Sequence, residues 1–147
     1  MRLAPIVAAA ALLLTPLPAA ALCSGLAVET VFACALKNSS REVHVCRLGD
    51  GSFLYSYGKP QTKPELELVR SRDQVKYDPW NGVGRYIWAY LSVENEGWRY
   101  QVGYSADRHE HTLEGYLNVF EPGADEPIVS RQCEPDTINH LLDDLDG

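Results

Sequence analysis

The chain has 147 residues, of which 46% are hydrophobic and 22% charged, and its formal net charge at pH 7 is −7. This length is sufficient for one domain built around a single hydrophobic core. The negative charge argues against a nucleic-acid partner, whose phosphates require lysine and arginine, and against adsorption to anionic lipid.

Residues 1–21 have the three parts of an export signal. Met1-Arg2 is a short positive start, residues 6–14 are an unbroken apolar run, and residues 19–21 are the small residues that a signal peptidase reads. The apolar run is too short to span a bilayer. We therefore predict cleavage near residue 21 and a single mature domain over residues 22–147, periplasmic or secreted, with no membrane insertion after cleavage. Of the 13 Lys and Arg residues one, Arg2, lies in the signal, which leaves 12 basic against 20 acidic residues and a net charge of −8.

The four cysteines, Cys23, Cys34, Cys46 and Cys133, all lie beyond the signal. In an oxidising compartment they predict two disulfides, for which three pairings are possible. Because Cys133 is far from the others, at least one bridge must tie the N-terminal third to the C-terminal end. No two cysteines have the two-residue spacing of a redox motif or a zinc knuckle. Lipidation of Cys23 would require a small residue before it, and Leu22 stands there, so we expect a soluble mature protein.

Alternating apolar residues and turn residues predict short β-strands along the mature chain. In chain order the strands are expected over residues 30–36, 41–47, 52–57, 65–69, 85–93, 98–104, 114–120 and 128–133. The alternation is clearest over residues 98–104, where Trp98, Tyr100, Val102 and Tyr104 share one face. After Pro135 the spacing of leucines predicts a short helix ending at residue 145. The predicted fold is all-β, with about eight strands, a short C-terminal helix and two disulfides, in a small antiparallel barrel or a sandwich.

Motifs of enzymes are missing from the sequence. There is no G-x-S-x-G elbow, no glycine-rich phosphate loop and no H-E-x-x-H helix. Gly82-Val83-Gly84 lies in a turn before a strand rather than between a strand and a helix, which argues against a dinucleotide site.

Two other groups of side chains have spacings that suit a metal site or a catalytic carboxylate pair, but their surroundings argue against both. His109 and His111 have a spacing that suits metal ligands on a strand, but they lie in a polar stretch that predicts a solvated loop. Glu65 and Glu67 resemble a glycosidase pair, yet neighbouring carboxylates on one strand face usually form a solvated surface. We therefore predict no catalytic residue, no metal and no cofactor.

Aromatic residues are concentrated in the middle of the chain. Eight of the 14 lie within 28 residues: Tyr77, Trp80, Tyr86, Trp88, Tyr90, Trp98, Tyr100 and Tyr104. Tyrosine and tryptophan are common anchors at protein interfaces, and their rings also provide platforms for sugars. The alternative is a large aromatic core, and both interpretations can hold for different rings.

Several short motifs together resemble a group of small exported bacterial β-proteins. The motifs are Phe32-Ala33-Cys34, Val43-His44-Val45-Cys46, Leu54-Tyr55-Ser56-Tyr57-Gly58, Pro64-Glu65-Leu66-Glu67-Leu68, Trp80-Asn81-Gly82-Val83-Gly84 and Cys133. The resemblance covers most of the mature chain, and it carries no assigned activity.

More distantly, the layout is similar to the membrane-bound or periplasmic inhibitors of C-type lysozyme. In those small β-barrels an early aromatic-x-Cys strand is tied to a late cysteine, places that Phe32, Cys34 and Cys133 would occupy here. A Ser-Gly-Ser-Gly-type loop of that family inserts into the lysozyme cleft. Residues 80–86 occupy a comparable place, with the serines missing. The resemblance implies a binding protein with Trp80 and Tyr86 as anchors.

Together these observations predict an exported, non-catalytic, lysozyme-inhibitor-like binding protein. Its acidic charge would steer it to a basic secreted hydrolase such as lysozyme. The predicted binding residues are Trp80, Asn81, Gly82, Gly84, Arg85, Tyr86, Trp88 and Trp98. The first alternative is a module that binds cell-wall glycan or peptidoglycan fragments through Trp88, Trp98 and Tyr100. The second is a similarity to lysozyme inhibitors in fold alone, with a different function. The third is a hydrolase that uses Glu65, Glu67 or His109.

Overall fold

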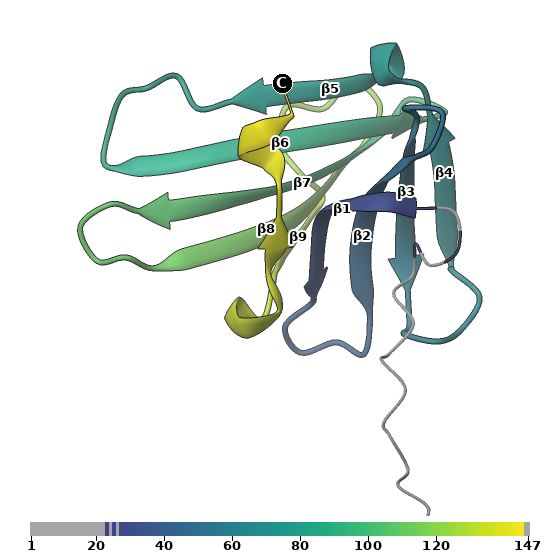
Figure 1. The fold of residues 1–147 in the computed structure, drawn as a ribbon, viewed down its shortest axis with the longest axis horizontal. Coiled ribbons are helices and arrows are strands. Elements are labelled where there is room, and N and C mark those ends of the chain that lie inside the picture. The colour runs from purple at the N-terminus through teal and green to yellow at the C-terminus, as the bar shows by residue number, and fades with distance from the viewer. Residues whose placement is uncertain (1–22, 24, 26, 146–147) are drawn as a thin grey trace, which may run out of the picture.

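The computed structural model describes residues 23, 25 and 27–145, which form two five-stranded antiparallel sheets (Figure 1). The predicted signal lies outside the described residues. The first sheet has the order β10-β1-β2-β3-β4, with β1 (Ala27–Ala35), β2 (Glu42–Leu48), β3 (Phe53–Gly58), β4 (Leu66–Arg70) and β10 (Asn139–His140). The second has the order β5-β6-β7-β8-β9, with β5 (Val75–Pro79), β6 (Tyr86–Asn95), β7 (Trp98–Asp107), β8 (Leu113–Phe120) and β9 (Val129–Gln132).

The all-β prediction is confirmed, and each of the eight predicted strands corresponds to an observed one. The sheets are not closed into a barrel, so the barrel alternative is wrong. Instead, the inner faces of the two sheets pack against one shared core. Strands with apolar side chains on one face bury that face, as antiparallel sheets commonly do. The fully buried members of this core come from both sheets and include Val31, Phe32, Val43, Val45, Phe53, Tyr55, Leu91, Val93 and Val102.

The predicted C-terminal helix is wrong. Residues 135–145 form two single 3₁₀ turns, η2 (Pro135–Thr137) and η3 (Leu142–Asp144), on either side of β10. Strand β10 pairs with β1, where His140 lies opposite Phe32. A helix this short is marginal in water, whereas pairing satisfies the backbone of an open sheet edge. Leu142 and Leu145 are buried in the core. These leucines therefore anchor the C-terminal segment to the core without forming the predicted helix.

Strands β6 and β7 form the longest hairpin of the described chain and carry most of the aromatic cluster. Their turn is Glu96-Gly97, and both residues have positive φ, at 51° and 85°. That conformation defines the two-residue turn whose twist matches the strands, and glycine adopts it without strain. The alternation predicted for β7 is confirmed, because Val102 and Tyr104 are buried on the inward face.

Disulfides join Cys23 to Cys46 and Cys34 to Cys133. The second confirms the predicted link between the N-terminal third and the C-terminal end. Two such bridges are typical of a protein that folds in an oxidising, extracytoplasmic environment. Over residues 23, 25 and 27–145, no helix is long and apolar enough to cross a membrane.

Candidate binding surface

Two loops meet at one end of the second sheet, at the left of Figure 1. Residues 80–85 join β5 to β6, and residues 108–112 join β7 to β8. The backbone N–H of Arg108 donates to the carbonyl of Arg85 at 3.1 Å, and its guanidinium donates to the carbonyl of Gly84 at 3.2 Å. The same guanidinium lies 5.5 Å from the Trp80 ring centroid. These contacts join the loops into one unit, residues 80–86 and 107–112, which we call the tip.

The electrostatic centre of the tip is the carboxylate of Asp107, whose side chain is only 4% exposed. Arg85 Nε donates to both oxygens of this carboxylate, at 2.8 Å to Oδ2 and 3.0 Å to Oδ1. Arg85 Nη2 also forms an ion pair with Oδ2 at 2.6 Å. The backbone N–H groups of His109 and Glu110 also donate to the carboxylate, at 2.8 and 3.2 Å. The Arg85 hydrogen bond, with these two donors, holds the Asp107 pKa far below its ordinary 3.8. The carboxylate therefore stays ionised and fixes both loops.

The first loop is also held by contacts within itself. The indole N–H of Trp80 donates to the carbonyl of Val83, and the N–H of Val83 donates to the Asn81 side chain, both at 3.0 Å. Gly82 and Gly84 have φ of +82° and +106°, which side chains rarely adopt. Open space surrounds both glycines, so their backbone is accessible to a partner.

The largest side chain of this loop, Trp80, is not the most exposed one. Val83 is 74% exposed and Tyr86 is 49% exposed, whereas Trp80 is half-buried. Trp80 therefore positions the loop, and Val83 together with Tyr86 at the start of β6 is exposed to solvent.

Strand β6 continues this surface along the outer face of the second sheet. Alternate residues Ala89, Leu91 and Val93 are buried in the core, which turns Tyr86, Trp88 and Tyr90 outward. The Trp88 and Tyr90 rings lie 5.5 Å apart and are tilted by 34°.

A glycine in the neighbouring strand makes room for this row of rings. Gly103 pairs with Tyr90 on one side and with Tyr116 of β8 on the other. A Cβ at Gly103 would lie 2.2 Å from Tyr90 Cδ1, so the Tyr90 ring rests directly on the glycine backbone. We call Tyr86, Trp88, Tyr90 and Tyr116 the aromatic strip.

Carboxylates border the aromatic strip. The hydroxyl of Tyr116 donates to Glu114, and burial together with this bond raises the pKa of Tyr116 above its ordinary value. Asp78 lies opposite Tyr90 on β5 and pairs with Lys76 at 3.5 Å. The rings are thus framed by side chains that can accept hydrogen bonds.

Seven of the eight predicted binding residues lie on the tip or on β6. The structure does not bring Trp98 to them, because it begins β7 beside the turn at the other end of the hairpin. Tyr100 faces inward and packs 5.5 Å from Tyr55 in the core. Trp88, Trp98 and Tyr100 therefore do not share a face.

Sequence reasoning missed three residues that complete this surface: Asp107, Arg108 and Tyr116. The alternation of side chains over residues 114–120 could have predicted that Tyr116 lies on the outer face of the sheet. The ion pair of Arg85 with Asp107 depends on the strand register, in which Tyr86 lies opposite Asp107.

Of the side chains considered for catalysis or metal binding, the two glutamates lie next to or on β4 in the first sheet, and the two histidines lie on the tip. Glu65 is held by Arg41 through two hydrogen bonds, at 2.6 and 3.0 Å, and Glu67 is exposed. His109 and His111 are exposed on the tip. In the described part of the chain, no three His, Cys, Asp or Glu residues are grouped so as to hold a metal ion.

Comparison of the chain with protein-family models, with curated proteins and with solved structures finds no match in any of the three. The similarity to lysozyme inhibitors therefore stands on the sequence motifs alone.

Proposed function

We propose that this protein is an exported, non-catalytic binding protein that recognises its partner through the tip and the aromatic strip. The observation that carries the proposal is the row of Tyr86, Trp88 and Tyr90 on the outer face of β6, all partly exposed. Tyr86 belongs to both parts, so the surface is continuous. Partly exposed Tyr and Trp grouped in one place are typical of interface hot spots.

The partner class that fits this surface is a basic secreted hydrolase such as a C-type lysozyme. The predicted mature chain carries a net charge of −8, which would accelerate its encounter with a cationic partner. The exposed glycine backbone and Val83 would enter the cleft of the partner, while the aromatic strip contacts its rim. This arrangement is that of an inhibitor that blocks an active site by occupying it.

The test is binding of the oxidised protein, residues 22–147, to a C-type lysozyme at low and moderate salt, with lysis followed in parallel. Tyr86→Ala should weaken binding by about 2 kcal/mol or more, roughly thirtyfold, because it removes a central anchor. Val69→Ala, at a 53% exposed position on β4, is the matched control and should leave affinity unchanged. Binding that disappears with salt, or that Tyr86→Ala leaves intact, would contradict the proposal.

The second candidate is a glycan-binding module, favoured by the adjacent Trp88 and Tyr90 rings at 5.5 Å. Sugars would stack on these rings, and their hydroxyl groups would donate hydrogen bonds to the carboxylates of Glu114 and Asp78. Titration with soluble muropeptides should then change the tryptophan fluorescence, and Trp88→Ala should abolish that change. A flat titration would count against this candidate.

A further inference from the structure

The two sheets leave a cleft between their inner faces at the corner where β3 and β4 approach β8 and β9. Its volume is about 400 Å³. Tyr55, Tyr100 and Leu117 form its floor, and Val129 lies at its rim, 37% exposed. Pockets that bury small ligands begin at about 300 Å³ and are lined mainly by apolar and aromatic side chains. The cleft has both properties.

The opposite corner of the sheets is closed. There β10 pairs with β1, Leu142 of η3 is fully buried, and the Cys34–Cys133 disulfide ties β1 to the segment after β9. Strands β4 and β9 are the outermost strands of their sheets, and no pairing between them is present in the described chain. The cleft is therefore a consequence of the topology.

The lining of the cleft includes a cationic side chain although the protein is acidic. Arg131 lies opposite Leu117 in the β8–β9 ladder and lines the cleft. Its guanidinium has no hydrogen bond or ion pair with any described residue. Glu65, the acidic group of the lining, is ion-paired with Arg41, whose positive charge balances that of the carboxylate.

We propose that this cleft binds a single-chain amphiphile with an anionic head, of the kind represented by a long-chain carboxylate. The apolar chain lies against Tyr55, Tyr100 and Leu117, and the head group pairs with Arg131 at the mouth. This site is separate from the tip and the aromatic strip, so it stands independently of the proposed function. The competing structural role for Arg131 is that of an inward charge that keeps the β9 edge from pairing with another chain.

The test is calorimetric titration of the oxidised protein, residues 22–147, with dodecanoate below its micelle concentration, beside dodecanol and dodecylamine. The site predicts saturable 1:1 binding of dodecanoate and weaker binding of the other two. Arg131→Gln should weaken dodecanoate binding roughly tenfold and leave dodecanol unaffected, since it removes a charged hydrogen-bond donor. Arg47→Gln, beside Glu29 at the far end of the β2–β3 hairpin, is the control with the same charge change and should bind normally.

Val129→Phe fills the mouth from an exposed edge position and should abolish binding while circular dichroism and the melting temperature stay unchanged. Absence of saturable binding by the folded wild type would overturn the proposal and leave Arg131 its edge-protecting role. Equal binding of the three amphiphiles, or unchanged affinity in Arg131→Gln, would overturn the anionic head. Self-association that Val129→Phe abolishes without amphiphile would also overturn it, because the cleft would then be an interface between copies.

Discussion

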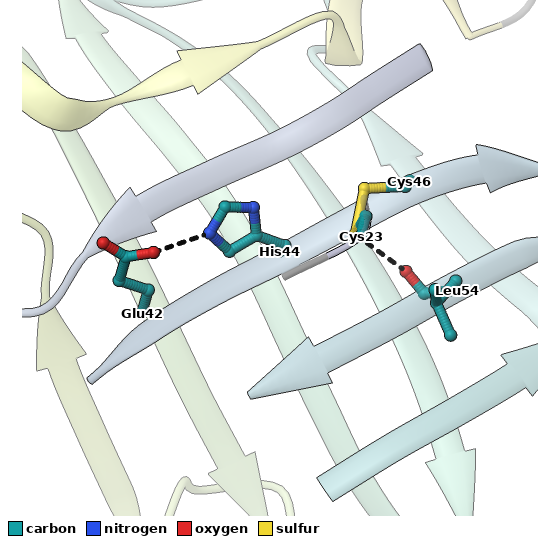
Figure 2. Close-up of a disulfide and its surroundings, with 5 residues drawn as sticks. All are labelled: Cys23, Glu42, His44, Cys46 and Leu54. Atoms are coloured by element: carbon teal, nitrogen blue, oxygen red, sulfur yellow. Dashed lines mark hydrogen bonds and ion pairs between the residues drawn. A yellow bond between two sulfur atoms is a disulfide. The ribbon is translucent and has the colours of Figure 1, made fainter. Parts of the chain in front are cut away.

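The outer faces of the two sheets differ in what covers them. On the first sheet, Cys23 is bonded to Cys46 and packs with Leu54 in a small second core (Figure 2). His44 lies along the same face, bonded to Glu42 at 3.0 Å, and is only 7% exposed. The outer face of the second sheet instead presents the aromatic strip, with Tyr86 half exposed.

This difference separates residues that stabilise the fold from residues that are available for binding. Rings as large as Trp88 and Tyr90 would contribute most to stability inside the core, yet they lie outside it, and the Tyr90 ring rests on Gly103. The covered face carries the Cys23–Cys46 disulfide, Leu54 and His44 instead of large rings. The exposed aromatic face is therefore the better candidate for recognition, and the two faces should respond differently to substitution.

The largest expected effect is on the covered face. Replacing Cys23 and Cys46 together by serine opens a loop of 23 residues and should lower the free energy of unfolding by about 3.5 kcal/mol in the chain-entropy model. The bond lies on the first sheet and the tip at the end of the second, so binding to the proposed lysozyme partner below the new melting transition should be retained. Urea denaturation and calorimetry measure both quantities. A loss of affinity in the folded variant would show that the two faces are coupled.

Gly103→Ala should have an intermediate effect on the exposed face. The added Cβ would meet the Tyr90 ring at 2.2 Å and the Ala89 carbonyl at 2.6 Å, so ring and backbone must move. We expect a loss of about 1–3 kcal/mol in stability, together with a weakened affinity for the partner. Gly123→Ala, at a glycine with open space around it, controls for the methyl group but also tests a positive φ of 75°. A Gly103→Ala variant with unchanged Trp88 fluorescence and affinity would remove the aromatic strip from the binding surface.

The smallest effect concerns pH and the tip. Because the pKa of Asp107 is depressed in the folded state, its contribution to stability is present above the ordinary value of 3.8 and is lost as pH falls below it. Asp107→Asn should therefore be less stable than wild type at pH 7, and the difference should shrink as pH falls below about 4. Melting temperatures from pH 2 to 7 measure this. A difference that is independent of pH would show that the carboxylate charge does not hold the loops.

The sequence predicted the strands where side-chain alternation is strong and failed where long-range pairing decides. Residues 98–104 gave β7 and its inward face correctly. The helix expected near residue 145 did not form, because β1 offers an open edge to Asn139 and His140. Strand β5 was missed because Lys76 and Asp78 make it look like a loop, although a charged edge strand ending at Pro79 is compatible with a sheet.

The candidate site shows the same division. Local alternation placed Tyr86 and Trp88 on one face, and the glycines of the loop indicated close backbone approach. The prediction that Trp88 and Trp98 act together required them to lie close together on one face. In the observed hairpin Trp98 lies opposite Asn95 beside the turn, and Trp88 lies near the other end of the hairpin. The pairing of Arg85 with Asp107, 22 residues apart, also depends on that register.

We propose that the tip and the aromatic strip together form the binding surface of this protein. The most direct measurement is an NMR titration of isotope-labelled protein with a C-type lysozyme at moderate salt, following each backbone amide. If the tip and the aromatic strip form it, shifts should be confined to residues 80–90, 107–112 and 114–116. An absence of shifts, or shifts centred on the face around Cys46 and Leu54, would contradict this proposal.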